Sequence, residues 1–149
     1  MNRKKKEIRT EIVIQARPEK VWGVLTSFPQ YPQWNPFLKK IEGPLQEGAQ
    51  ITARIEPPGS SGMTFKPTLL VVSPARELRW LGHLFVPGLF DGEHVFELYE
   101  NTDGSTTFVQ REEFGGILVP LFEKMLDNNT LAGFNAMNQS LKARAEASR

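Results

Sequence analysis

Hydrophobic and polar residues alternate along much of the first 115 positions of the chain. In residues 7–15, Ile8, Ile12 and Ile14 fall on one face, as expected of a strand with one buried side. Six further segments combine strand-forming residues with turn residues at their ends. They are residues 37–42, 49–56, 63–73, 76–86, 89–100 and 105–114. The pattern therefore predicts a run of seven antiparallel strands.

Two parts of the chain have helical periodicity instead. Pro18 suits the first turn of a helix, and apolar residues recur after it at helical spacing until Pro29. A second apolar stripe predicts one long helix over about residues 118–145. Its members are Leu118, Leu121, Phe122, Met125, Leu126, Phe134, Met137 and Leu141. We therefore expect an α+β domain in which a curved seven-stranded sheet wraps around the last helix, with two short helices after the first strand.

The composition is that of an ordinary globular domain. The 149 residues are enough to bury a core without a metal or disulfides, and we expect residues 1–149 to form a single domain. The basic residues 1–6 and the tail 146–149 are expected to lie outside its ordered part. The 18 basic and 17 acidic residues nearly balance, so charge gives no reason to expect a nucleic acid partner.

Several kinds of chemistry are made improbable by what the sequence lacks. There is no cysteine, which excludes disulfides, thiol nucleophiles and zinc–thiolate sites. There is no phosphate-binding loop, dinucleotide turn, zinc-protease motif or nucleophile elbow, and there are two histidines, so we expect neither a metal nor a nucleotide cofactor. No segment has the apolar length of a membrane span, and no signal-peptide core follows the basic start. We therefore expect a cytoplasmic protein without stable membrane insertion.

Four stretches of the sequence carry a resemblance to a known family. They are PEKVWGVLTSFPQYPQWNPF, PGLFDGEHVFEL, REEFGG and GFNAMNQSLKARAE. Together they resemble the SRPBCC superfamily, the helix-grip fold of START lipid-transfer domains and polyketide cyclases, over about Ile8 to Glu146. The resemblance implies a seven-stranded antiparallel sheet that grips a C-terminal helix, with an internal cavity for an apolar molecule. It implies no particular reaction, because the superfamily spans carriers, cyclases, hydroxylase subunits and chaperone-ATPase activators.

Two of the predicted strands place polar and aromatic residues on the same face. His94, Phe96 and Leu98 share one face of residues 89–100, and Phe108, Gln110, Glu112 and Phe114 share one face of residues 105–114. The opposite orientation would bury Glu93, Glu97, Arg111 and Glu113, which is costly unless every charge is paired. We therefore expect the first set to point inward, as in a pocket that orients a small molecule.

His94 and Glu112 form a candidate acid–base pair. A carboxyl group and an imidazole that share a pocket can exchange a proton with a substrate. The alternative is that His94 is a hydrogen-bonded core residue without a catalytic role, which is the commoner fate of a lone histidine on an apolar face.

The predicted final helix is interrupted by a polar run and a glycine. Glycine in a helix interior costs about 1 kcal/mol relative to alanine, so something should be gained at Gly133. One explanation is close packing of the helix on the sheet. The other is that Gly133 opens space for a ligand, with Asn129 as a polar contact.

Two apolar segments fall where solvated loops are expected. The first is YPQWNPF, residues 31–37, and the second surrounds the Pro87-Gly88 turn, with Leu84, Phe85, Val86, Leu89 and Phe90. We expect both to form the wall and lid of the cavity, with Trp34 and Trp80 turned inward, although Trp34 could equally fill the core. The indole N–H of Trp80 would then need an acceptor, and Asn35 can close a turn through its side chain.

Three functions remain open from the sequence. The first is binding or carrying of a small hydrophobic molecule such as a lipid, a polyketide or an aromatic metabolite. The second is a cyclase or dehydratase that uses His94 and Glu112. The third is a protein-interaction module of the chaperone-ATPase-activator type. In each case the protein is expected to be a monomer or a homodimer. The candidate ligand-binding residues are Trp34, Phe37, Phe65, Trp80, Leu84, Phe90, His94, Phe96, Phe108, Gln110, Glu112, Phe122, Met125, Asn129 and Gly133.

Overall fold

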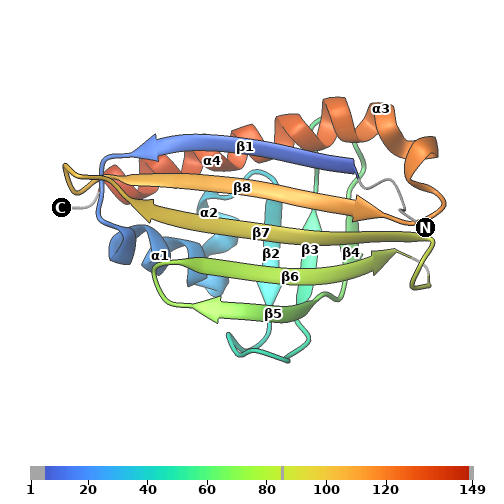
Figure 1. Ribbon diagram of the computed structural model, residues 1–149, viewed down its shortest axis with the longest axis horizontal. Coiled ribbons are helices and arrows are strands. Elements are labelled where there is room, and N and C mark those ends of the chain that lie inside the picture. Colours follow the sequence, from blue (N-terminus) through green and yellow to red (C-terminus); the bar gives the residue numbers. More distant parts are fainter. Residues whose placement is uncertain (1–5, 85, 148–149) are drawn as a thin grey trace.

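The computed structural model describes residues 6–84 and 86–147 as two antiparallel sheets and a long C-terminal helix (Figure 1). The strands are β1 (Lys6–Ile14), β2 (Leu38–Glu42), β3 (Thr52–Ile55), β4 (Met63–Phe65), β5 (Thr68–Ser73), β6 (Glu77–Leu84), β7 (Phe90–Glu100) and β8 (Thr106–Gly115). Five of them form a sheet in the order β1-β8-β7-β6-β5, and the other three form a sheet in the order β2-β3-β4.

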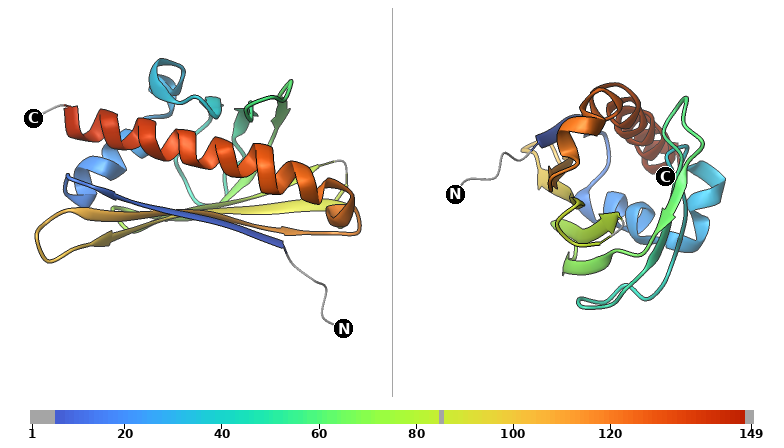
Figure 2. Two further views of the ribbon diagram at one scale, coloured as in Figure 1. Left: turned by 90° about the horizontal axis from the view of Figure 1, so that it is seen from above. Right: turned by 90° about the vertical axis from the view of Figure 1, so that its right-hand side faces the viewer.

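Helices connect the strands near both ends of the chain. After β1 come α1 (Pro18–Thr26), a 3-10 turn (Phe28–Gln30) and α2 (Tyr31–Trp34). After β8 come a 3-10 turn (Val119–Phe122), α3 (Glu123–Met125), a π-helical segment (Leu126–Thr130) and α4 (Leu131–Ala147). Figure 2 shows α4 lying along one face of the five-stranded sheet, with the three-stranded sheet on another side of the helix. This arrangement confirms the predicted α+β class with a sheet wrapped around the last helix.

The prediction of one seven-stranded sheet is wrong. The segment 63–73, expected to be one strand, is divided at Lys66 and Pro67 into β4 and β5, which belong to different sheets. Proline has no N–H for a strand ladder, and the Pro67 carbonyl instead accepts a hydrogen bond from Ile51 N at 2.9 Å. An isolated bridge between Gln50 and Thr68 links the two sheets at this point.

Regular structure extends further at both ends of the described chain than the sequence indicated. Lys6 belongs to β1, and its Nζ lies 2.5 Å from Asp127 Oδ1. The last helix is not uniform from 118 to 145, because it begins with the 3-10 and π-helical turns and continues to Ala147. Glu146 is therefore not part of a tail, since its carboxylate accepts a hydrogen bond from Gln15 N at 2.7 Å. Residues 1–5, Phe85 and residues 148–149 lie outside the described residues.

The strand register places the predicted polar residues on the inner face of the five-stranded sheet. His94 lies opposite both Glu112 and Trp80, and Gln110 lies opposite Phe96. His94 is 3% exposed and Gln110 is fully buried. The orientation that the sequence favoured for these strands is therefore the one adopted.

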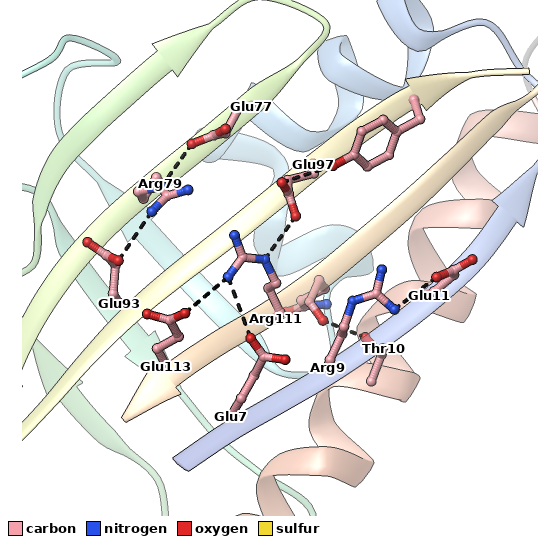
Figure 3. Close-up of polar contacts among 12 residues, drawn as sticks. Glu7, Arg9, Thr10, Glu11, Glu77, Arg79, Glu93, Glu97, Arg111 and Glu113 are labelled. Atoms are coloured by element: carbon pink, nitrogen blue, oxygen red, sulfur yellow. Dashed lines mark hydrogen bonds and ion pairs between the residues drawn. The ribbon is translucent and has the colours of Figure 1, made fainter. Parts of the chain in front are cut away.

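The outer face of the same sheet carries the charges that the opposite orientation would have buried (Figure 3). Arg111 Nε on β8 lies 2.9 Å from Glu97 Oε1 on β7, and its Nη1 reaches Glu7 at 3.7 Å and Glu113 at 3.6 Å. Arg79 on β6 pairs in the same way with Glu77 and Glu93. These ion pairs, some within a strand and some between neighbouring strands, leave the inner face free for apolar packing.

Glu97 makes the stability of the protein depend on pH. Burial of Glu97 opposes ionisation, but hydrogen bonds from Arg111 and Tyr99 outweigh it and hold the pKa of the carboxyl below its ordinary value. The resulting stabilisation is complete above the unfolded-state pKa of about 4.3 and is lost as the pH falls through the lower folded-state pKa. We expect Glu97→Gln to lower the free energy of unfolding by about 0.5–1 kcal/mol at pH 7, because the pairs are partly screened by solvent.

Urea denaturation at pH 7 and at pH 3 measures this effect. Glu19→Gln is the matched control, because the Glu19 side chain is 69% exposed and lies 3.9 Å from its partner Arg17. A Glu97→Gln loss that is as large at pH 3 as at pH 7 would contradict the role of the ionised carboxyl.

Candidate functional site

A cavity of about 140 Å³ lies between the inner face of the five-stranded sheet, the β3–β4 hairpin and the start of the C-terminal helix. Eight of the predicted ligand-binding residues line it. They are Phe37, Phe65, Leu84, Phe90, His94, Glu112, Phe122 and Met125. The cavity wall is mainly aromatic and aliphatic, and its polar lining residues are Ser60, His83, His94, Glu112 and Thr130.

Two glycines create the floor of this cavity. Gly82 on β6 and Gly92 on β7 are directly opposite each other in the register, so this part of the inner face has no side chains. The Phe65 ring and the Glu112 carboxyl group occupy part of the space that the two glycines leave. A β-carbon at Gly82 would lie 3.0 Å from the Phe65 ring, and one at Gly92 would overlap Glu112 Oε2. The paired glycines therefore leave space for both the cavity and the Glu112 carboxyl group.

The polar edge of the cavity is the His94–Glu112 pair. His94 Nδ1 lies 3.2 Å from Glu112 Oε1, and the Glu112 side chain is 15% exposed. The imidazole packs against aromatic rings. Its centroid is 4.4 Å from that of Phe96, with the rings stacked, and 5.0 Å from that of Phe134. The ring orientation is thereby fixed by packing as well as by hydrogen bonds.

A buried polar network continues from His94 to the helix and to β1. His94 Nε2 lies 2.9 Å from Gln110 Oε1, and Gln110 Nε2 donates to Asn138 Oδ1 at 2.8 Å. Asn138 Nδ2 donates to Thr10 Oγ1 at 2.8 Å. Asn138 was not identified from the sequence, although it interrupts the apolar stripe of Phe134 and Leu141 at helical spacing, which is a usable signal.

Several predicted site residues lie away from the cavity wall. Trp80, Phe96 and Phe108 are buried in the core, and Gln110 acts through the network just described. Trp34 does not turn into the cavity. It lies on α2, with its ring centroid 5.1 Å from that of Tyr31. The indole nitrogens of Trp34 and Trp80 are buried without a hydrogen-bond partner among the described residues, so the acceptor expected for Trp80 is not found there.

Gly133 and Asn129 serve packing within the described chain. A β-carbon at Gly133 would overlap Cδ1 of Phe37, so the space that this glycine leaves is filled by the Phe37 ring. The close-packing explanation therefore accounts for Gly133. Asn129 Nδ2 donates to the carbonyl of Pro58 at 2.7 Å, which ties the π-helical segment to the β3–β4 hairpin beside the cavity.

The apolar loop 31–37 is mostly core. Tyr31 is fully buried, its hydroxyl donates to the Leu25 carbonyl, and burial raises its pKa. Asn35 Oδ1 accepts hydrogen bonds from Phe37 N at 3.0 Å and Leu38 N at 2.8 Å, which is the predicted side-chain turn. Of the three aromatics in the loop, only Phe37 lines the cavity, so the loop forms one wall and no lid.

The β6–β7 turn contributes two of its apolar residues to the cavity. Leu84 and Phe90 line it, and the Phe90 ring centroid is 5.3 Å from that of Phe122. Val86 is 58% exposed instead. The lid prediction for Phe85 concerns a residue outside the described ranges.

Other cavity residues were missed by sequence reasoning. Phe114 was expected on the inward face of its strand but not among the ligand-binding residues, and it lines the cavity. Gly82 and Gly92 also line it, and a glycine inside a strand pattern is a general sign of close approach. The β3–β4 hairpin contributes Ile55 and Met63, for which the sequence offered no signal.

The chain belongs to the polyketide cyclase/dehydrase and lipid transport family, whose model matches residues 5–146. It is thus a member of the SRPBCC superfamily, which includes ligand binders and polyketide cyclases. A search of curated proteins finds no significant match.

Solved structures with the same fold include proteins of different activity. The Zhui aromatase/cyclase from Streptomyces sp. R1128 has 16% sequence identity and a TM-score of 0.72, over 95% of this chain and 96% of that one. Norcoclaurine synthase from Thalictrum flavum, in complex with dopamine and hydroxybenzaldehyde, has 14% identity and a TM-score of 0.76, over 99% and 90%. The protein TTHA0849 from Thermus thermophilus has 16% identity and a TM-score of 0.74, over 95% and 98%. At these identities the likeness shows the fold alone.

The described residues include no helix with the length and hydropathy needed to cross a membrane. Among the same residues, no group of three or more potential metal-ligating side chains lies close together. The expectation of no metal and no cofactor stays a prediction.

Proposed function

We propose that this protein binds one small, mainly apolar molecule in the cavity between its sheets and its C-terminal helix. The observation that carries the proposal is the cavity volume of about 140 Å³. An apolar protein cavity of about 150 Å³ accommodates benzene. Apolar walls with a few polar groups are also typical of small-molecule sites. A molecule of about one substituted ring therefore fits this space.

Larger ligands require more room than the cavity has. A lipid or a polyketide chain exceeds its volume, so binding one would require the β3–β4 hairpin to move away from Asn129. Support for these ligands comes from the family description, whereas the cavity itself favours an aromatic metabolite of one ring.

Isothermal titration with toluene and indole tests the proposal. We expect the wild-type protein to bind one molecule per chain, and Met125→Trp, which fills the cavity, to lower the affinity about tenfold or more, equivalent to about 1.4 kcal/mol. Leu121→Trp is the matched control, because Leu121 is 76% exposed in the same C-terminal segment. Failure of the wild type to take up either probe, or equal binding by Met125→Trp, would refute the proposal.

Acid–base catalysis on the bound molecule is a second candidate function. The contact of 3.2 Å between His94 Nδ1 and Glu112 Oε1 favours it, because the pair lies at the edge of the cavity. A proton-transfer activity of the cyclase or dehydratase type should be lost in His94→Gln while toluene binding is kept. Unchanged turnover in that variant would exclude His94 from catalysis.

A further inference from the structure

The direction of each hydrogen bond in the buried network is fixed by a main-chain carbonyl. The Gln110 carbonyl oxygen lies 2.9 Å from Thr10 Oγ1, and because a carbonyl can only accept, the hydroxyl hydrogen of Thr10 points to it. Thr10 can then only accept from Asn138, so the amide nitrogen of Asn138 faces Thr10 at 2.8 Å. The amide oxygen of Asn138 must therefore face Gln110.

A second carbonyl fixes Gln110 independently. The main-chain oxygen of Phe134 lies 3.4 Å from Gln110 Nε2 and also requires a donor. Both partners on this side of Gln110, Asn138 Oδ1 and Phe134 O, thus require its NH₂ group. Its oxygen Oε1 then faces His94 Nε2 at 2.9 Å, so Nε2 carries a hydrogen.

The position of that hydrogen determines how His94 can interact with Glu112. With Nε2 protonated, Nδ1 is a bare acceptor in the neutral ring and a donor in the charged ring. Nδ1 lies 3.2 Å from Glu112 Oε1, which is an ion-pair distance without the alignment of a hydrogen bond. The neutral ring therefore gives no hydrogen to Glu112, and both carboxylate oxygens of Glu112 can accept one from elsewhere.

The second carboxylate oxygen of Glu112, Oε2, can accept a hydrogen bond but cannot donate one. Oε2 lies above Gly92, and both residues line the cavity. Among the residues that the structure describes, no donor forms a hydrogen bond to Oε2. The polar edge of the cavity thus offers an acceptor with which a bound molecule can pair.

We propose that the ligand is an uncharged, ring-sized molecule with a hydroxyl group, of the phenol class, which donates a hydrogen bond to Glu112 Oε2, and that Gln110 and Asn138 are the positioning residues that hold the neighbouring His94 with its hydrogen on Nε2. The ligand class rests on the function proposed above. An anionic ligand would place its charge against an acceptor, and the mainly apolar wall favours an uncharged donor over a hydrated cation.

Phenol and toluene test the ligand class, because they have the same number of heavy atoms and differ in the hydroxyl group. The ratio of phenol affinity to toluene affinity is measured in the wild type and in Glu112→Leu. Comparing the two ratios cancels the difference in hydration between the probes. We expect the ratio to fall about tenfold or more in the variant, as for a lost hydrogen bond to a charged or acidic group. An unchanged ratio with toluene still bound overturns this inference and leaves the proposed function intact. Binding of neither probe to the wild type overturns both.

The tautomer of His94 is a separate test that needs no ligand. Long-range ¹H–¹⁵N correlation spectra distinguish the ring nitrogens, and the His94 signals are assigned by their loss in His94→Gln. We expect a hydrogen on Nε2 in the wild type, and an Nδ1–H form with bare Nε2 to appear in Gln110→Leu, in which the acceptor is removed. A wild-type Nε2 without a hydrogen refutes the positioning role, as does a spectrum that Gln110→Leu leaves unchanged.

Discussion

Replacing Phe134 with alanine is expected to lower the free energy of unfolding by about 3–5 kcal/mol. Phe134 is fully buried on α4, and its ring centroid lies 5.5 Å from that of Phe37 and 5.0 Å from that of His94. Its removal leaves a void beneath a wall of the cavity and beside the imidazole. Urea denaturation monitored by circular dichroism measures the loss.

Phe122→Ala is the matched control for Phe134→Ala. Phe122 is half-buried in the 3-10 turn and contacts Phe90, so truncation should cost about 1–2 kcal/mol. Equal losses in the two variants would mean that Phe134 does not anchor the helix to the core as its burial indicates.

Alanine at two helical glycines should have opposite effects on stability. A β-carbon at Gly133 would overlap the ring of Phe37, which is buried against Phe134, so Gly133→Ala is expected to destabilise the protein by about 1–3 kcal/mol through overpacking. At Gly23 in α1 nothing lies within 4 Å of such a carbon. Gly23→Ala should therefore stabilise the protein by up to about 1 kcal/mol through helix propensity alone.

The two glycine variants are compared by their unfolding midpoints under one condition. Stabilisation by Gly133→Ala would show that Phe37 can move away at little cost, and the cavity wall that it forms would then be adjustable.

Strand faces were predictable from the sequence because charge and apolar residues alternate with period two. Glu97 and Arg111 could not be buried cheaply, and that decided the orientation of His94 and Gln110. The division of residues 63–73 was missed even though Pro67 marks it, because the apolar pattern on its two sides is continuous. The π-helical turn at 126–130 lies in a polar run that periodicity alone does not resolve.

The site was predictable where it depends on strand parity and unpredictable where it depends on distant packing. Phe37 and Trp34 occur in one loop and are equally apolar, yet the short helix α2 directs Trp34 away from the cavity. The partnership of Asn138 with Thr10 joins residues 128 positions apart, and no local pattern encodes it. The glycine pair on β6 and β7 becomes meaningful only when the register is known.

Gly92 determines both the position of the Glu112 carboxyl group and the volume of the cavity. A methyl group there would occupy the place of the Glu112 carboxyl oxygen and would also reduce the volume open to a guest. A homologue with a larger residue at this position must therefore hold its carboxyl group in another conformation, and its cavity must be smaller. The size of the cavity and the position of the Glu112 carboxyl group therefore depend on the same residue, and we expect positions 92 and 112 to co-vary among homologues.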